Sequence, residues 1–266
     1  MNIIVCIKQV PGIADVKINP ETNTLIREGV SSIINPFDMY AIEEGLRLKE
    51  KFGGKVTVIS LGPPQSINAL REALGMGADE AIQLSDRAFA GSDSWATAYT
   101  LAWAIKKLGE FNIILCGKQA IDGDTGQVGP GIASQLGITQ LTYVFKIIKI
   151  EPGAGTIKVE RLLEEGREIV EARLPALLTV VKDINQPRAA TLFHIRRAAQ
   201  LQIPTWTAAD LPGVELSKLG LSGSPTQVIR ISSPPKREGV LNLIKTDSVE
   251  QSAAILADKI IAEKIL

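Results

Sequence analysis

Residues 116–130 form a segment whose composition favours ligand binding. It contains four glycines and lies between an apolar, strand-like run and a helix expected at 127–136. Glycines let the backbone approach a ligand closely and adopt positive φ. Successive N–H groups at the start of a helix form a site for anions such as phosphate. Thr125 and Gln127 could add neutral hydrogen bonds, and Lys118 could add a positive charge.

The same spacing also suits an ordinary glycine-rich connection in which Thr125 caps the helix. Two carboxylates, Asp122 and Asp124, would repel phosphate if they pointed inward, so we expect them to face water or bind ribose hydroxyls. The segment matches neither a Walker loop nor the GxGxxG fingerprint. An adenylating enzyme would carry a Ser-Gly-Gly-type loop after the first strand, where this sequence has Lys8-Gln9-Val10-Pro11-Gly12. The segment therefore predicts a nucleotide site without a standard motif.

Residues for acid–base or metal chemistry are scarce in this sequence. His194 is the only histidine, and Cys6 and Cys116 are the only cysteines. A metal site needs clustered ligands, and no GxSxG elbow occurs. We expect His194 at the surface or an interface, and the two cysteines as buried thiols in strands. We assign no catalytic or metal-binding residue, so any redox chemistry must come from a cofactor.

The composition of the chain excludes several classes of partner. Its 266 residues are 45% hydrophobic, which suits one large α/β domain, or one domain with an arm. Lys+Arg and Asp+Glu both total 29, so the basic excess of a typical nucleic-acid binder is missing. No apolar run reaches the roughly 18 residues of a membrane span, and the N-terminus lacks signal-peptide features. We expect a cytoplasmic protein without nucleic-acid binding or membrane insertion.

Strand-like and helical patterns alternate along the first 140 residues. The expected strands are 3–7, 56–61, 81–84 and 113–116, and the expected helices are 35–52, 64–74 and 94–108. This alternation is typical of βαβ units, and it predicts an α/β fold with a mainly parallel sheet and helices on both faces. Asn35 suits the N-cap of the first helix, and Asp38 lies in its first turn. An apolar stripe predicts that Trp95 is buried in the core.

The pattern changes after Gly137. Expected strands at 143–150, 157–163, 168–172 and 176–181 are separated by turn signals, which predict hairpins. From Asn185 the chain is irregular and proline-rich, too long for a loop inside a compact domain. A final helix is predicted with Asp247 as its N-cap. We therefore expect a nucleotide-binding α/β domain at 1–184 and, at 185–266, a C-terminal arm and helix that pack on another protein.

Several stretches resemble the β subunits of electron-transfer flavoproteins, and the likeness runs along nearly the whole chain. They are Lys8-Gln9-Val10-Pro11, Asn35-Pro36-Phe37, residues 117–124 and residues 159–179, supported by 185–188 and 190–192. The resemblance implies a Rossmann-like domain with an added β-hairpin region. It also implies a heterodimer whose α subunit holds an electron-transferring FAD and is embraced by the C-terminal arm of this chain.

The resemblance further implies which residues bind the nucleotide and the partners. The nucleotide contacts fall on Cys6, Asn35, Pro36, Phe37, Asp38, Leu61, Gln119, Ala120, Ile121, Asp122, Gly123, Asp124, Thr125, Gly126, Gln127, Val128, Gly129 and Pro130. Residues 190–192 resemble the loop that docks a partner dehydrogenase, with Leu192 as its apolar anchor. Glu168 resembles a carboxylate that meets an arginine of the α subunit.

Two kinds of β subunit occur in this family. Simple members bind AMP as a structural ligand, whereas electron-bifurcating members bind a second FAD that accepts a hydride from NADH. Simple members usually have a cysteine after Asn-Pro-Phe, where this chain has Asp38, and their loop is more crowded than residues 123–130. The resemblance thus favours FAD, with a partner acyl-CoA or similar dehydrogenase or reductase and a low-potential carrier such as ferredoxin or flavodoxin as acceptors. AMP is the alternative.

Overall fold

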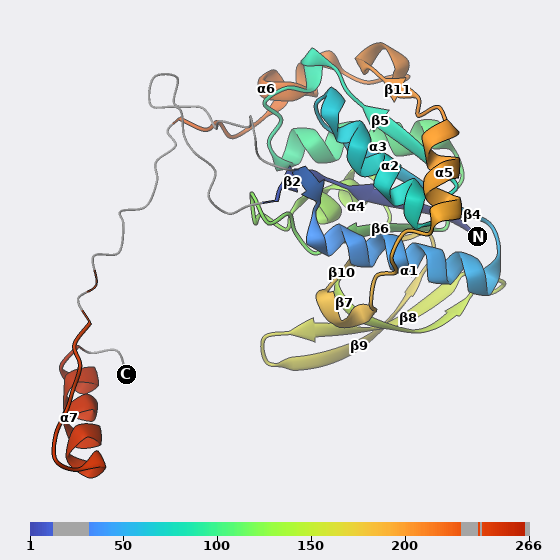
Figure 1. Ribbon diagram of the computed structural model, residues 1–266. Coiled ribbons are helices and arrows are strands. Elements are labelled where there is room, and N and C mark those ends of the chain that lie inside the picture. The colour runs from blue at the N-terminus through green and yellow to red at the C-terminus, as the bar shows by residue number, and fades with distance from the viewer. Residues whose placement is uncertain (13–31, 230–238, 240, 264–266) are drawn as a thin grey trace. The chain divides into compact units, whose positions relative to one another are not determined.

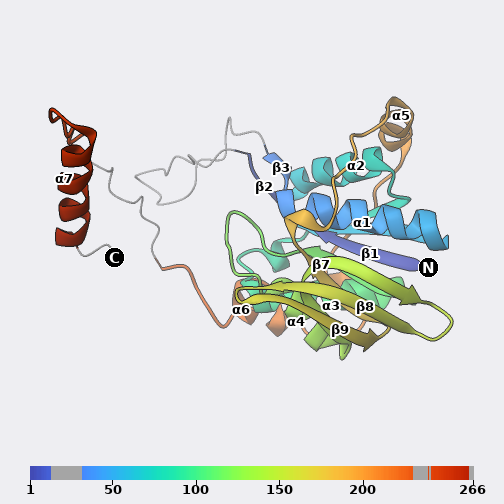
Figure 2. The same ribbon diagram turned by 90° about the horizontal axis from the view of Figure 1, so that it is seen from below.

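A computed structural model describes residues 1–12, 32–229, 239 and 241–263. The chain divides into two compact units, Met1–Arg230 and Ile231–Leu266, which are described separately. The first unit contains a large sheet with helices on both of its faces (Figures 1 and 2). It carries all of the residues expected to bind a nucleotide.

The large sheet has nine strands in the order β11-β5-β4-β1-β6-β10-β7-β8-β9. All neighbours from β11 to β7 are parallel, and β7-β8 and β8-β9 are antiparallel. This confirms the predicted mainly parallel sheet with an added hairpin region. The strands are β1 (Asn2–Ile7), β4 (Lys55–Leu61), β5 (Glu80–Leu84), β6 (Ile113–Gly117), β7 (Thr139–Glu151), β8 (Thr156–Leu163), β9 (Gly166–Arg173), β10 (Ala176–Val180) and β11 (Thr205–Trp206). A separate antiparallel pair joins β2 (Gln9–Pro11) to β3 (Ser32–Ile34).

Helices α1 (Pro36–Phe52) and α2 (Ile67–Met76) cover one face of the sheet, and α3 (Ser94–Leu108) and α4 (Val128–Leu136) cover the other (Figure 2). Side chains of β1 alternate between them, since Ile3 and Val5 pack with α1 and α2 while Ile4 packs with α3 and α4. Burial on both faces explains why the parallel strands are continuous apolar runs. The remaining helices of this unit are α5 (Leu192–Gln200), α6 (Gly220–Gly223) and 3₁₀ turns at Pro64–Ser66, Arg87–Phe89, Lys182–Ile184, Ala208–Asp210 and Leu216–Lys218.

Two predictions about the expected helices were wrong: the burial of Trp95 and the N-cap of the last helix. Trp95 is 40% exposed rather than buried. It lies in the first turn of α3, where its ring stacks on that of the buried Tyr99. Ser248, not Asp247, is the N-cap of α7 (Val249–Ala262), and its hydroxyl accepts a hydrogen bond from Gln251 N. Either residue type can cap a helix, so composition alone did not fix the boundary.

Residues 185–229 are more ordered than the irregular sequence suggested. They contain α5, which lies on α2, and β11, which pairs with β5 (Figure 1). Within this chain the two compact units divide after Arg230, and the expected domain boundary at 184/185 stays a prediction. Packing of the C-terminal region on a partner stays a prediction, and residues 230–238 and 240 lie outside the described residues. In the second unit, α7 leaves apolar residues such as Val249 and Ile261 exposed.

The order of the sheet reverses between β1 and β6, which makes this edge a candidate for ligand binding. The chain passes from β1 to β4 on one side, whereas β6 pairs with β1 on the other. Ligands of open α/β sheets bind at such a reversal, outside the carboxyl ends of the strands. Asp38 lies at this position, where Lys8 N donates to its Oδ2 at 2.7 Å and Gly117 N donates to its Oδ1 at 3.1 Å. One buried carboxylate thus ties the ends of both strands to α1.

Asp38→Ala should destabilise the chain, because it leaves these two backbone N–H groups without their acceptor, at a cost of about 1–3 kcal/mol. Burial raises the pKa of the Asp38 carboxyl to about 7. Between about pH 4 and 7 the carboxyl of Asp38 therefore stays protonated in the folded chain but is ionised in the unfolded chain. The contribution of Asp38 to the stability of the wild type consequently falls as the pH rises through this range. The difference in free energy of unfolding between the wild type and Asp38→Ala should therefore be smaller at pH 7 than at pH 5, by about 1–2 kcal/mol.

Urea unfolding at several pH values measures this difference. Asp122→Ala is the matched control, since it removes only the partly exposed ion pair of Asp122 with Lys8 and should cost less than about 1 kcal/mol. If Asp38→Ala instead destabilised the chain more as the pH rises, the two hydrogen bonds would lower the pKa of Asp38 by more than burial raises it.

Candidate functional site

Asn35 holds the glycine-rich loop against the start of α1. Its Nδ2 donates to Gln119 O at 2.9 Å, and its Oδ1 accepts from Ile121 N at 3.1 Å. Asn35 occupies the N-cap position as predicted, but its side chain makes no capping hydrogen bond. The amide hydrogen-bonds to the loop instead, through one donor and one acceptor. Because Asn35 is 1% exposed, this brace is buried and fixes the backbone of residues 119–121.

The two loop carboxylates have partners within the chain. Lys8 Nζ lies 2.7 Å from Asp122 Oδ1, and Gln119 Nε2 donates to Asp124 Oδ1 at 2.7 Å. These contacts reduce the expected repulsion of a phosphate. Asp122 forms an ion pair with Lys8, and Asp124 accepts a hydrogen bond from Gln119 of the same loop. Ribose binding by either residue stays a prediction.

The four glycines of the segment have different structural roles. Gly126 has φ +63°, a backbone conformation that residues other than glycine rarely adopt. A Cβ on Gly129 would lie 2.6 Å from Thr179 Cγ2, and one on Gly117 would overlap Asp38 and Phe37, so these two glycines permit close packing. A Cβ on Gly123 would meet no atom within 4 Å. Gly123 therefore faces open space and leaves the loop uncrowded there.

The start of α4 can receive an anion. Thr125 does not cap this helix, because the N-cap is Gln127, which makes no side-chain capping bond. Thr125 Oγ1 instead accepts from Ser94 Oγ at 3.2 Å and from Gln127 N at 3.4 Å. The first N–H groups of a helix lack intrahelical acceptors and bind phosphate well. Val128 and Gly129 present such groups, whereas Pro130 has no N–H to contribute.

The structure brings together most of the residues predicted to bind a nucleotide. Asn35 to Asp38 and the 119–130 loop meet above the ends of β1 and β6, where Cys6 and Cys116 lie side by side in register. A hydrogen bond with Cys6, together with burial, raises the pKa of the Cys116 thiol well above its ordinary range, which fits the predicted inert thiols. Leu61 lies one strand away, at the half-buried end of β4.

The sequence reasoning missed Ser94 and Tyr143 at the rim of this site, and it anticipated Lys118 only as a positive charge. Ser94 reaches the loop from α3, and Lys118 lies between two aromatic rings, with its Nζ 5.8 Å from the centre of Phe37 and 5.3 Å from that of Tyr143. Tyr143 adopts φ +57° where β7 and β10 shift register. These residues come from elements far apart in the sequence, so no local spacing marks them as a group.

The two predicted partner residues lie away from the loop. Leu192, at the start of α5, is 87% exposed, and Phe193 beside it is 74% exposed. Thr191 caps this helix by accepting from His194 N at 3.2 Å, and His194 itself is half-buried. Glu168 on β9 pairs with Arg161 of the same chain at 2.7 Å. Contact of Glu168 with an arginine of another subunit stays a prediction.

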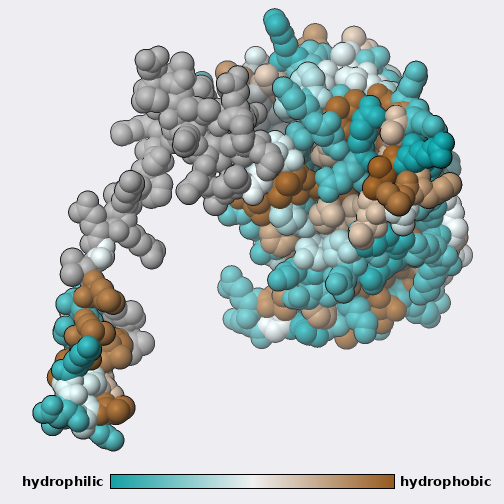
Figure 3. Space-filling view, in the orientation of Figure 1, coloured by the Kyte–Doolittle hydropathy of each residue, from teal (hydrophilic) through white to brown (hydrophobic). Residues whose placement is uncertain are grey.

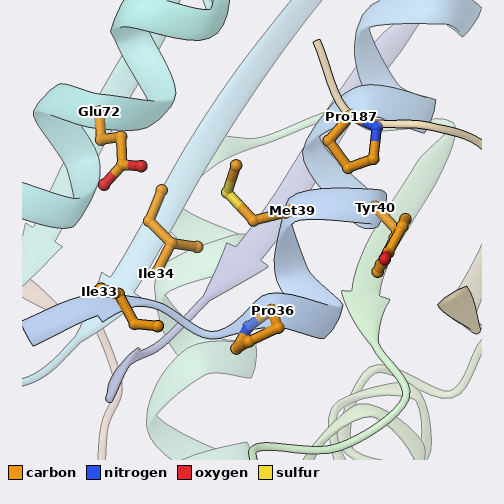
Figure 4. A pocket seen from close by; sticks show the side chains of 7 residues that line it. All are labelled: Ile33, Ile34, Pro36, Met39, Tyr40, Glu72 and Pro187. Carbon is orange, nitrogen blue, oxygen red and sulfur yellow. The ribbon is translucent and has the colours of Figure 1, made fainter. Parts of the chain in front are cut away.

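A separate hollow of about 340 Å³ lies beside the start of α1 (Figure 4). We call it the α1 hollow; its lining residues are Ile33, Ile34, Pro36, Met39, Tyr40, Glu72 and Pro187. Its volume is at the lower end of small-ligand pockets, and it has no glycine-rich backbone to receive phosphate. The α1 hollow is therefore a separate feature from the glycine-rich loop.

Two further properties concern the described part of the chain alone. No group of three or more His, Cys, Asp or Glu side chains there could hold a metal ion. None of its helices is both long enough and apolar enough to cross a membrane.

Comparison with known proteins assigns the chain to a family. The profile of the electron transfer flavoprotein domain matches residues 22–211. The chain is 50% identical to the electron transfer flavoprotein subunit beta of Clostridium acetobutylicum, over 98% of each chain. It is 50% identical to the subunit beta of Thermoanaerobacterium thermosaccharolyticum over 100% of both chains, and 48% identical to Protein FixA of Bradyrhizobium diazoefficiens over 98% of this chain and 91% of that protein. The chain therefore belongs to the electron transfer flavoprotein family.

Proposed function

We propose that this chain is the β subunit of an electron-transfer flavoprotein heterodimer and binds an adenine nucleotide at the 117–130 loop. The observation that carries the proposal is the buried Asn35 brace, which presents this loop and the start of α4 at the strand-order reversal. Relatives named subunit beta, which match over the full chain, support the pairing with an α subunit.

We infer that the bound nucleotide is FAD rather than AMP. The open space beside Gly123 and the exposure of residues 121–125 support a ligand larger than AMP. A bound FAD would accept a hydride from NADH and release the electrons to a partner dehydrogenase or reductase and to a low-potential carrier such as ferredoxin or flavodoxin. The AMP alternative would make this chain a structural support for the FAD of the α subunit.

The residues of this chain then act by binding and positioning. The first N–H groups of α4 receive a phosphate, and Gly126 turns the backbone toward that helix. Asn35 keeps the loop in place, while Lys8 offsets the charge of Asp122 beside the phosphate. A preformed loop loses little conformational freedom on binding, which favours tight retention of the nucleotide.

A nucleotide inventory tests the proposed function directly. The chain is co-expressed with its α subunit, the heterodimer is denatured, and the released FAD and AMP are quantified. We expect two FAD and no AMP per heterodimer. One FAD and one AMP would replace the bifurcating role by the structural one, and one FAD with no nucleotide from the β subunit would contradict nucleotide binding at the loop.

Gly126→Val should abolish nucleotide retention, because a β-branched residue resists the positive φ on which the loop depends. The readout is nucleotide per purified heterodimer. Gly137→Val is a matched control, since Gly137 has nearly the same φ, +67°, at the other end of α4, and a Cβ there meets no atom within 4 Å. Equal nucleotide content in the two variants would show that the loop is not the binding site.

Leu192→Ala should weaken electron transfer to a partner dehydrogenase while leaving the nucleotide content intact, because an exposed apolar anchor contributes to docking and not to the fold. The rate at limiting dehydrogenase is expected to fall several-fold. Leu216→Ala is the control, since Leu216 is also exposed, at 66%, but lies outside α5. Unchanged rates for Leu192→Ala would exclude α5 as the docking element.

A further inference from the structure

The α1 hollow adjoins the segment expected to dock a dehydrogenase. Glu72 lines the hollow, and Gly75, three residues on, lies on the same face of α2. A Cβ on Gly75 would lie 3.5 Å from Ala190 Cβ and 3.6 Å from Ile195 Cγ1. The hollow and the start of α5 therefore share one strip of α2. Figure 3 shows hydrophobic residues at the surface in the region of α5.

The wall of the hollow is held in place by polar contacts on both sides of Pro187. Asn185 Nδ2 donates to Tyr40 O at 3.0 Å and to Glu44 Oε2 at 3.0 Å. Arg188 Nε lies 2.7 Å from Glu43 Oε2, a carboxylate buried in α1. These contacts fasten the connector that leads into α5 onto α1. The hollow is thus preformed, so a partner does not have to order it on binding.

The charge of Glu72 in the hollow has no ion-pair partner among the described residues. Glu72 makes no ion pair with any residue that the structure describes, whereas Glu43 on α1 has two arginine partners. Glu72 is exposed as a residue, but partial desolvation of its carboxyl raises the pKa of that group, since desolvation disfavours the charged form. A cation placed beside this carboxylate would offset that cost. Figure 4 shows Glu72 on one side of Met39 and Tyr40 on the other, so a long side chain could contact apolar surface with its stem.

We propose that the α1 hollow receives a lysine or arginine side chain of the partner dehydrogenase, as a second anchor beside Leu192. The inference rests on the proposed function, because it takes docking at α5 as given. An apolar anchor on α5 and a charge-complementary one on the neighbouring α2 define both the position and the orientation of the partner. The aromatic ring of Tyr40 adds a surface that attracts cations.

Glu72→Gln tests the proposal, because it removes the charge and keeps the shape of the side chain. The purified heterodimer is assayed for electron transfer with an acyl-CoA dehydrogenase, at varied heterodimer concentration and at low and moderate salt. We expect the KM for the heterodimer to rise by about three- to tenfold at low salt, with kcat unchanged. The dependence of KM on salt should also weaken, since one attractive charge pair is lost.

Glu110→Gln is the matched control, because Glu110 is an exposed glutamate beyond the end of α3 and should change neither value. Reduction of a small dye by each heterodimer reports its flavin function without docking, and it should be equal in all variants. A raised KM in Leu192→Ala with an unchanged KM and salt dependence in Glu72→Gln would overturn the hollow as an anchor and leave the proposed docking intact. Unchanged KM in both variants would overturn the docking role of α5 and the inference with it.

Discussion

The first turn of α1 sets the geometry on which the candidate site depends. Parallel strands end with backbone N–H groups that have no partner unless another element supplies an acceptor. Asp38 supplies it to Lys8 N after β1 and to Gly117 N at the end of β6. Three residues earlier, Asn35 accepts a hydrogen bond from Ile121 N and donates one to Gln119 O. One helical turn therefore links two strands and a loop, so the shape of the site follows from the placement of a single helix.

The sequence predicted the centre of the fold better than its edges. The apolar runs at 3–7, 56–61, 81–84 and 113–116 lie within β1, β4, β5 and β6, because strands covered on both faces are apolar throughout. The predicted helix at 94–108 has the bounds of α3. By contrast, α5 was missed because its nine residues depend on the Thr191 cap and on packing against α2, neither of which produces a long periodic pattern. The three-residue strands β2 and β3 leave no pattern at all.

The site was predictable as a place but not as a set of interactions. Glycine content and position after a strand identified the 117–130 loop, yet the four glycines could not be separated into packing, turn and open positions without their neighbours. Asn35 had the residue type of an N-cap, and helix propensity assigns its side chain to the helix. The observed partner of that side chain lies 84 residues away. Competition between a local and a distant partner is decided by the tertiary fold, and local spacing carries no information about it.

A zero net charge conceals how this surface could recognise partners. Two of the acidic side chains of α1, Glu43 and Glu50, form ion pairs with Arg47 or Arg188, so charge differences on this surface are local. Exposed apolar side chains include Leu192 and Phe193 in one compact unit and several residues of α7 in the other. A 14-residue helix with no buried residue is marginal in water on its own. The exposed apolar side chains of α7 therefore favour packing on another surface, and in the proposed heterodimer we expect the α subunit to provide it.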